Sequence, residues 1–279
     1  MSRTLLVKYA FLLRRETDVG RETSFYDFVP YRFGPFSFAL YRELASLEKR
    51  GYIEWEENGV RLSASRESEM TNALRRVPDT GRAAIEHIIQ RYGLANTDDL
   101  LRDIYRRYPW YAVKSERRDL ISERPPLPEG AGGRIFTVGY EGKSVDAFFN
   151  QLLAEGVEVL IDVRANPISR KYGFARTSMR EIAGKLDIEY RHFPELGIPA
   201  RLRADLSDYE SYRKLFERYE TTVLARRVTE LEGIGELAHR FSVALVCMEA
   251  DPRYCHRARV AEALRRKGGF EITHLGQAA

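Results

Sequence analysis

The spacing of apolar residues along the chain changes near its middle. Before residue 124, apolar residues recur at the spacing of amphipathic helices, as in Leu5, Leu6, Tyr9, Leu12 and Leu13. After residue 133, short apolar runs alternate with amphipathic segments. Alternating strands and helices are typical of a parallel sheet with helices packed on its faces. The pattern therefore predicts two different folds in one chain.

A proline- and glycine-rich stretch, ERPPLPEGAGG, lies between these two patterns and predicts an extended connection. We expect a mainly helical, winged-helix-like domain at residues 1–124, a linker at 125–133 and an α/β domain at 134–279. The fold class predicted for the α/β domain is a Rossmann-like, mostly parallel sheet with helices on both faces.

The first domain contains a helix followed by a hairpin. An amphipathic helix around residues 38–48 precedes Gly51, a natural helix-ending residue. Two alternating segments follow, at 52–55 and 60–62, with Asn58-Gly59 as the expected turn. This order is that of a winged helix, whose helix enters a DNA groove. The phosphate contacts that we expect are Arg42, Lys49 and Arg61. The same arrangement also serves as a protein-docking or dimerisation module, and that alternative stays open.

Polar residues follow the predicted strands of the second domain. In open parallel sheets the ligand crevice lies outside the carboxyl ends of the strands. We therefore expect the polar groups that follow the strands to meet at one edge. Asp162 and Arg164 can form a buried pair that orients a loop, or Arg164 can bind a phosphate or carboxylate there. The expected ligand- or phosphate-binding residues are Gly139, Tyr140, Asp162, Arg164, Ser169 and Arg257.

The densest polar cluster is CMEADPRYCHR, residues 247–257. Cys255 begins a predicted helix, where free N–H groups, the helix dipole and the adjacent His256 and Arg257 should lower the pKa of its thiol. The thiol is then a nucleophile or an anion contact. The structural alternative is a buried, inert cysteine, which is our expectation for Cys247. Candidate catalytic residues are Cys255, Glu249, His192 and His256.

The sequence gives little indication of a metal site, a membrane span or a secreted protein. The spacing C-x7-C-H is not a usual zinc pattern and has no obvious fourth ligand, so neither a metal nor a cofactor is predicted. No stretch approaches the roughly 20 apolar residues of a membrane span. The N-terminus lacks a signal-peptide cleavage site, and the chain has only two cysteines. We therefore expect a cytoplasmic protein.

Charge permits a nucleic-acid partner without requiring one. The 279 residues include 45 Lys and Arg against 41 Asp and Glu, a net charge of +4. A solvated surface of mixed charge explains this composition equally well.

Several motifs together resemble a known bacterial and archaeal family. GYEG, LIDVRANPISR, HFPELG and CMEADPRYCHR are similar to the family called domain of unknown function 488, over about residues 133–276. Residues 24–65 look like winged-helix modules fused to such domains. LIDVR also looks like a rhodanese strand, but the Cys–His–Arg order departs from the rhodanese loop. The family pattern falls on Gly139, Tyr140, Asp162, Arg164, Pro167, His192, Leu196, Gly197, Cys247, Glu249, Cys255, His256 and Arg257.

The hypothesis that joins these observations is an enzyme acting on nucleic acid or a nucleotide. The first domain would hold the polymer, and Arg164, Arg257 and the last helix would bind a phosphate-bearing group. A second hypothesis is a non-enzymatic DNA-binding regulator whose α/β domain senses a ligand or thiol oxidation. A third is a rhodanese-like sulfurtransferase that carries a persulfide on Cys255.

Overall fold

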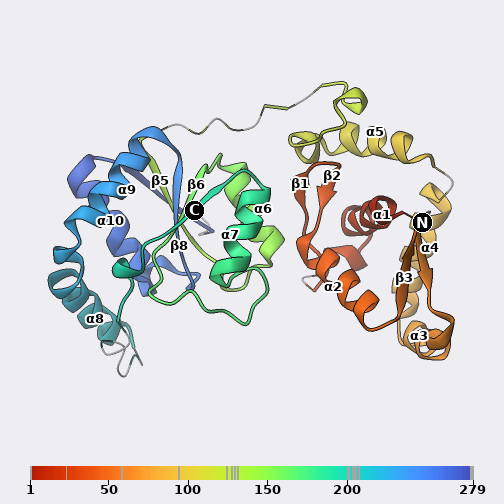
Figure 1. The fold of residues 1–279 in the computed structure, drawn as a ribbon, viewed down its shortest axis with the longest axis horizontal. Coiled ribbons are helices and arrows are strands. Elements are labelled where there is room, and N and C mark those ends of the chain that lie inside the picture. Colours follow the sequence, from red (N-terminus) through yellow and green to blue (C-terminus); the bar gives the residue numbers. More distant parts are fainter. Residues whose placement is uncertain are drawn as a thin grey trace. The chain divides into compact units, whose positions relative to one another are not determined.

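The chain folds into two compact units, Met1–Pro126 and Leu127–Ala279 (Figure 1). The computed structural model describes residues 2–276 except 23, 58, 94, 124, 127, 129, 131, 200, 201, 203–205 and 207. Among these residues, no helix has both the length and the apolar character needed to span a bilayer.

The N-terminal unit is mainly helical and is organised around its first helix. Ser2 caps this helix, and Val7, Phe11 and Leu12 are almost completely buried in the core of the unit. Lys8 is buried with them, and its Nζ donates to the backbone oxygen of Pro35 at 2.7 Å. The elements are α1 (Arg3–Glu16), β1 (Val29–Tyr31), β2 (Gly34–Phe36), α2 (Phe38–Lys49), β3 (Ile53–Glu56), β4 (Gly59–Leu62), α3 (Glu67–Arg75), α4 (Asp79–Tyr92) and α5 (Thr97–Arg107).

The helix and hairpin expected from the sequence are present as α2, β3 and β4. Ser37 caps α2 by accepting a hydrogen bond from the backbone nitrogen of Leu40. Gly51 follows the helix with a φ of 73°, a left-handed conformation that glycine adopts without strain. The hairpin pairs Glu56 with Gly59. Gly59 is therefore a strand residue and not a turn residue as predicted, and Asn58 lies outside the described residues. The short β1–β2 hairpin and α3 were not predicted.

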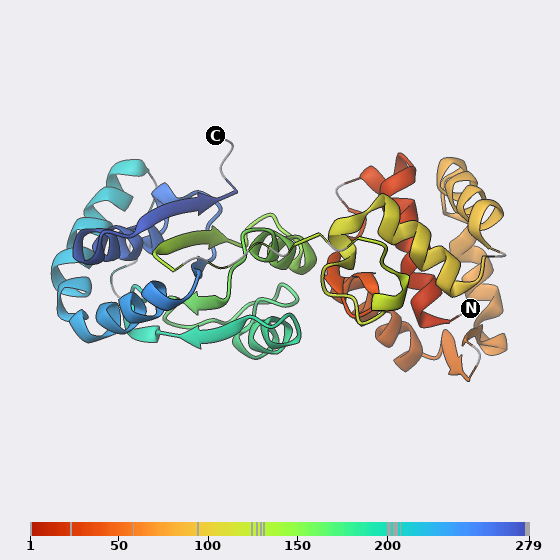
Figure 2. The same cartoon turned by 90° about the horizontal axis from the view of Figure 1, so that it is seen from above.

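The C-terminal unit contains a five-stranded parallel sheet in the order β7-β6-β8-β5-β9. Helices α6 and α7 cover one face, and α8, α9 and α10 cover the other (Figure 1 and Figure 2). The predicted α/β fold class is therefore confirmed. The elements are β5 (Arg134–Gly139), α6 (Val145–Ala154), β6 (Val159–Asp162), α7 (Arg176–Lys185), β7 (Glu189–His192), α8 (Tyr209–Thr222), α9 (Val228–Arg240), β8 (Val243–Cys247), α10 (His256–Gly268) and β9 (Glu271–Leu275).

The central strands are buried on both faces, as their continuous apolar sequences suggest. Every residue of β6 and β8 is buried. The register places the last residues of the strands close together: Gly139 pairs with Cys247, and Asp162 pairs with both Val246 and His192. Strand pairing alone therefore places residues from four distant parts of the sequence at one edge of the sheet.

Candidate functional site

A pocket of about 310 Å³ lies at the carboxyl ends of β5, β6 and β8. Its polar lining comes from the residues that end or follow these strands. The lining residues are Tyr140, Arg164, Ala165, Asn166, Ile168, Ile198, Pro199, Cys247, Met248 and Glu249. Pockets at this position in parallel sheets are common ligand sites.

Arg164 lines the pocket, and each of its N–H groups is directed at a partner within the protein. Nε and Nη2 donate to the two carboxylate oxygens of Asp162 at 2.8 and 2.6 Å. Nη1 donates to the Tyr140 hydroxyl at 3.2 Å and to the backbone oxygen of Phe174 at 2.9 Å, and Nη2 also lies 3.8 Å from the sulfur of Met179. Burial alone would lower the pKa of Arg164, but the hydrogen bonds and charge of Asp162 raise it. The arrangement corresponds to the buried pair that orients a loop, and it leaves Arg164 no spare donor for a phosphate.

Gly139 and Tyr140 shape the pocket through packing. A Cβ atom on Gly139 would lie 1.9 Å from the backbone oxygen of Glu249, so β5 and the segment after β8 approach closely only because this residue is glycine. The ring of Tyr140 stacks on Phe174 with centroids 4.4 Å apart. Ser169 accepts from the backbone nitrogen of Lys171 at 3.1 Å and stabilises its own turn.

Arg257 is completely buried and stabilises the backbone next to the pocket. Its guanidinium donates to the backbone oxygens of Glu249 and Ala250 and lies 3.4 Å from the hydroxyl of Thr137. It does not line the pocket. The structure thus gives Arg257 a positioning role toward Glu249 in place of the predicted contact with a phosphate.

Both cysteines are buried, which confirms the expectation for Cys247, whose exposure is 2%. Cys247 also lines the pocket, and its thiol donates to Glu249 Oε2 at 3.2 Å. Cys255, expected to be reactive, is 1% exposed and does not line the pocket. Burial raises the pKa of the Cys255 thiol well above its ordinary value, and the neighbouring Cys247 adds to this effect. The predicted lowering was wrong because burial disfavours the thiolate. The side chain also makes no capping hydrogen bond to the helix N–H groups.

Glu249 is the carboxylate of the pocket. Burial alone would raise its pKa, but hydrogen bonds from Cys255, its own backbone and Cys247 lower it below the ordinary value. The side chain is therefore ionised at neutral pH and can accept a proton or a hydrogen bond from a bound molecule.

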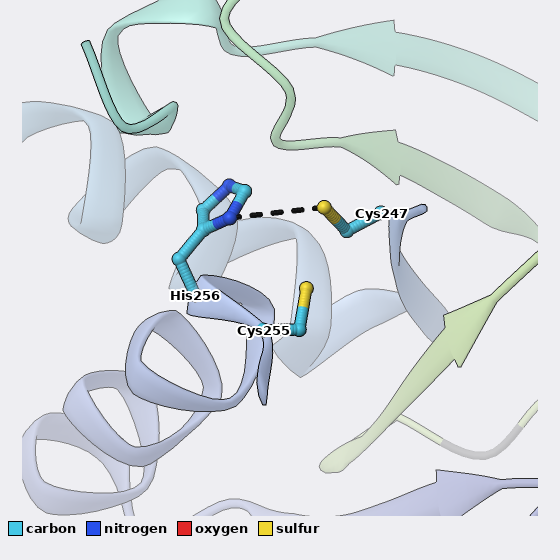
Figure 3. Close-up of side chains that lie close together, drawn as sticks. All are labelled: Cys247, Cys255 and His256. Carbon is cyan, nitrogen blue, oxygen red and sulfur yellow. Dashed lines mark hydrogen bonds between the residues drawn. The ribbon is translucent and has the colours of Figure 1, made fainter. Parts of the chain in front are cut away.

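His256 extends from the start of α10 toward Cys247 at the end of β8 (Figure 3). Its Nε2 lies 2.9 Å from the backbone oxygen of Val163, and its Nδ1 lies 3.7 Å from Cys247 Sγ. Because a carbonyl oxygen only accepts, Nε2 carries a hydrogen, and Nδ1 can offer a lone pair toward the sulfur atoms. Burial alone would lower the pKa of His256, but the interaction with Cys255 raises it.

His192, the fourth predicted catalytic residue, is close to the pocket but does not line it. Its Nε2 lies 2.8 Å from the backbone oxygen of Arg164, which it holds in place. Glu195, three residues further along the chain and the nearest carboxylate after His192 in the sequence, is exposed. Asn166, which the strand-end rule indicates but our site prediction omits, lines the pocket instead.

The three residues expected to contact nucleic acid lie on α2 and the β3–β4 hairpin of the N-terminal unit. Arg61 forms ion pairs with Glu54 and Glu56. Arg42 and Lys49 are exposed on α2, which also carries the exposed Glu43 and Glu48. The elements that carry these three basic residues therefore also carry exposed or ion-paired acidic side chains.

These features define an α/β protein with a polar pocket at the carboxyl edge of a parallel sheet. Residues 144–264 match the family model described as domain of unknown function DUF488, which supports the resemblance assigned to the C-terminal unit. The matched range begins after Gly139 and Tyr140, and it does not extend to the N-terminal unit. Neither the curated proteins nor the solved structures contain a significant match.

Proposed function

We propose that the C-terminal unit is an enzyme that acts on a nucleotide or on nucleic acid, and that its reaction takes place beside Cys247 and Glu249. The observation that carries the proposal is the convergence of chemically different groups on one pocket. A carboxylate, a thiol, an amide and a phenol, from Glu249, Cys247, Asn166 and Tyr140, line the same cavity. Such convergence from three strand ends is typical of active sites in parallel sheets.

The lining favours the base or sugar of a nucleotide over its phosphate. The pocket volume of about 310 Å³ is at the lower end of the range for small-molecule sites. Ile168, Ile198 and Met248 offer apolar contact, and Asn166 and Glu249 offer hydrogen bonds of the kind that recognise base edges. Since the donors of Arg164 are directed at Asp162, Tyr140 and Phe174, a phosphate group would extend out of the pocket.

The chemistry is assigned to Glu249 as the group that accepts a proton. Its ionised side chain lies in a buried environment, where hydrogen bonding to a substrate is strong. Arg257 fixes the backbone on which Glu249 is carried. A carboxylate in this position contributes about 10²- to 10⁴-fold to a reaction that needs a general base.

The test is a survey of nucleosides, nucleotides and short oligonucleotides, measured for binding by calorimetry and for turnover by chromatography. We expect at least one member to be converted, and Glu249→Gln to lower kcat at least about 100-fold. Glu181→Gln, which removes an exposed carboxylate paired with Lys185, is the matched control and should keep full activity. If no member of the survey binds or reacts, the proposal is wrong for this class of substrate.

A second candidate is the DNA-binding regulator that senses thiol oxidation. Two observations favour it: the ligand atoms of Cys247 and Cys255 lie within 4.8 Å, and α2 followed by β3 and β4 has the order of a winged helix. A gel shift that changes with oxidant, without conversion of any nucleotide, would favour this candidate. The sulfurtransferase receives less support, since a buried Cys255 outside the pocket is poorly placed to carry a persulfide.

A further inference from the structure

Cys247, which lines the pocket, forms a buried cluster with Cys255 and His256 (Figure 3). The two sulfur atoms and one imidazole nitrogen all lie within 4.8 Å of one another. A tetrahedral zinc ion, with bonds of about 2.3 Å to sulfur and about 2.0 Å to nitrogen, sets a sulfur and a nitrogen ligand about 3.6 Å apart. The observed distance between Cys247 Sγ and His256 Nδ1 is 3.7 Å.

We propose that Cys247, Cys255 and His256 bind one zinc ion. Two thiolates and an imidazole are the soft and borderline donors that select zinc over magnesium or calcium. The sequence spacing argues against this site because Cys247 and Cys255 are separated by a turn of unusual length for a zinc motif. In the folded protein that turn brings the start of α10 back to the end of β8, so the sequence spacing ceases to matter.

The histidine is oriented as a metal ligand usually is. A zinc-bound histidine normally donates its other ring N–H to a carbonyl or a carboxylate, which fixes the ring and the tautomer. His256 Nε2 makes this contact with the backbone oxygen of Val163 at 2.9 Å. The lone pair of Nδ1 is therefore directed to the side on which Cys247 lies.

The ligands are carried by rigid parts of the fold. Cys247 is the last residue of β8 and is held by pairing with Gly139. Cys255 and His256 begin α10, and Arg257 ties the same helix to the backbone at Glu249 and Ala250. Little chain ordering would accompany metal binding, which favours a high affinity.

We place the fourth coordination position of the zinc ion on the side of the site where Glu249 lies. Its Oε2 lies 3.2 Å from Cys247 Sγ, and both residues line the pocket. Three protein ligands with a fourth position open to water are the arrangement of catalytic zinc sites. We propose that Glu249 contacts a water molecule in that position. The zinc ion would activate this water for attack on a substrate. This assignment rests on the proposed function, whereas zinc binding itself does not.

The test is metal binding by the reduced, full-length protein. After chelator treatment, we expect one equivalent of zinc to bind in competition with a coloured chelator. Cobalt should give the intense visible bands of a tetrahedral ion and a thiolate-to-cobalt charge-transfer band. Because the sequence contains only two cysteines, this band can arise only from Cys247 and Cys255.

Variants identify the ligands. Cys247→Ser and Cys255→Ser should each remove about half of the charge-transfer intensity and weaken zinc binding at least about 100-fold, since changes outside the ligand shell alone cost 10- to 100-fold. His87→Gln, at an exposed position of α4, is the control and should bind zinc normally. If the serine variants do not fold, X-ray absorption of the zinc-loaded wild-type protein should give two sulfur neighbours and one imidazole.

The proposal would be overturned by zinc binding below one tenth of an equivalent, or by an X-ray absorption spectrum without sulfur neighbours. A disulfide between Cys247 and Cys255 that persists in reductant and excludes zinc would have the same consequence. A protein that binds zinc through these residues but converts no nucleotide would keep the metal site and reject the proposed substrate class. The two failures are therefore distinguishable.

Discussion

Arg164 and Asp162 form a paired contact at the carboxyl end of β6, with Nε to Oδ1 at 2.8 Å and Nη2 to Oδ2 at 2.6 Å. The side chain of Asp162 is fully buried, and that of Arg164 is 7% exposed. Asp162 Oδ2 also accepts from the Tyr190 hydroxyl at 2.6 Å. The pair therefore connects β6 with β7, and through Tyr140 and Phe174 it connects β6 with the wall of the pocket.

Replacing Asp162 by Asn should strongly destabilise the C-terminal unit. The change leaves a buried guanidinium without its countercharge, which costs about 3–5 kcal/mol in comparable cases. Glu189→Gln, which breaks the half-exposed pair with Arg191 on β7, should cost less than about 1 kcal/mol. Urea unfolding followed by circular dichroism measures both. Equal effects of the two variants would show that the buried pair contributes no more than a surface pair.

The unfolding of the two units can be observed separately. Both tryptophans, Trp55 and Trp110, lie in the N-terminal unit, so tryptophan fluorescence follows that unit alone. A change confined to the C-terminal unit should alter the circular dichroism transition and leave the fluorescence transition in place.

Gly139→Ala should disturb both stability and the pocket. The added methyl group would lie 1.9 Å from the Glu249 backbone oxygen, so the segment that carries Glu249 must move. We expect a loss of about 1–3 kcal/mol in unfolding free energy, as for overpacked sites. Gly184→Ala is the matched control, because a Cβ there meets nothing within 4 Å and the residue lies in α7. The control should be neutral or stabilising by up to about 1 kcal/mol. Similar stability of the two variants would contradict the close approach at Gly139.

The stability of the N-terminal unit should rise between pH 7 and pH 9.5. Burial lowers the pKa of Lys8 to about 7, whereas the unfolded chain keeps the ordinary value of 10.5. Between these values the unfolded state binds more protons than the folded state, so raising the pH favours folding. The unfolding free energy of this unit should rise by about 3 kcal/mol or less, as measured by urea unfolding with tryptophan fluorescence.

Lys8→Met serves as the comparison for this pH dependence. It removes the titrating amine and keeps a long side chain in the same buried place. The variant should lack the rise in stability above pH 7. If wild type and variant depend on pH in the same way, Lys8 keeps its proton in the folded protein.

The periodicity of the sequence was enough to predict the α/β fold and most of its strands. Apolar runs such as VEVLIDVR and SVALVC are continuous because β6 and β8 are buried on both faces. The short strands β1 and β2 were missed because three residues with a proline in each give no periodic signal. The order of the five strands depends on contacts between distant segments. The local pattern of apolar residues carries no information about those contacts.

For the candidate site, too, the sequence predicted some features and left others to the tertiary structure. The rule that polar residues after parallel strands share one edge correctly brought Tyr140, Arg164 and Glu249 to a common pocket. It did not say which side chains would already be engaged with protein partners. The pair of Arg164 with Asp162 was one of two alternatives from the sequence, whereas the hydroxyl and backbone partners of Arg164 and Arg257 were visible only in the folded structure.

By itself the sequence determined most of the segments that form strands and helices, because burial and backbone preference act at short range. The tertiary structure alone decided the roles of the two cysteines. The sequence pattern favoured Cys255 over Cys247 as the reactive thiol, but the turn between β8 and α10 buries both sulfur atoms and leaves only Cys247 in the lining of the pocket. The reactivity of a thiol depends on its solvent exposure and on the charges around it. Those quantities are set by distant residues that pack together, and for this reason they could not be derived from the local sequence.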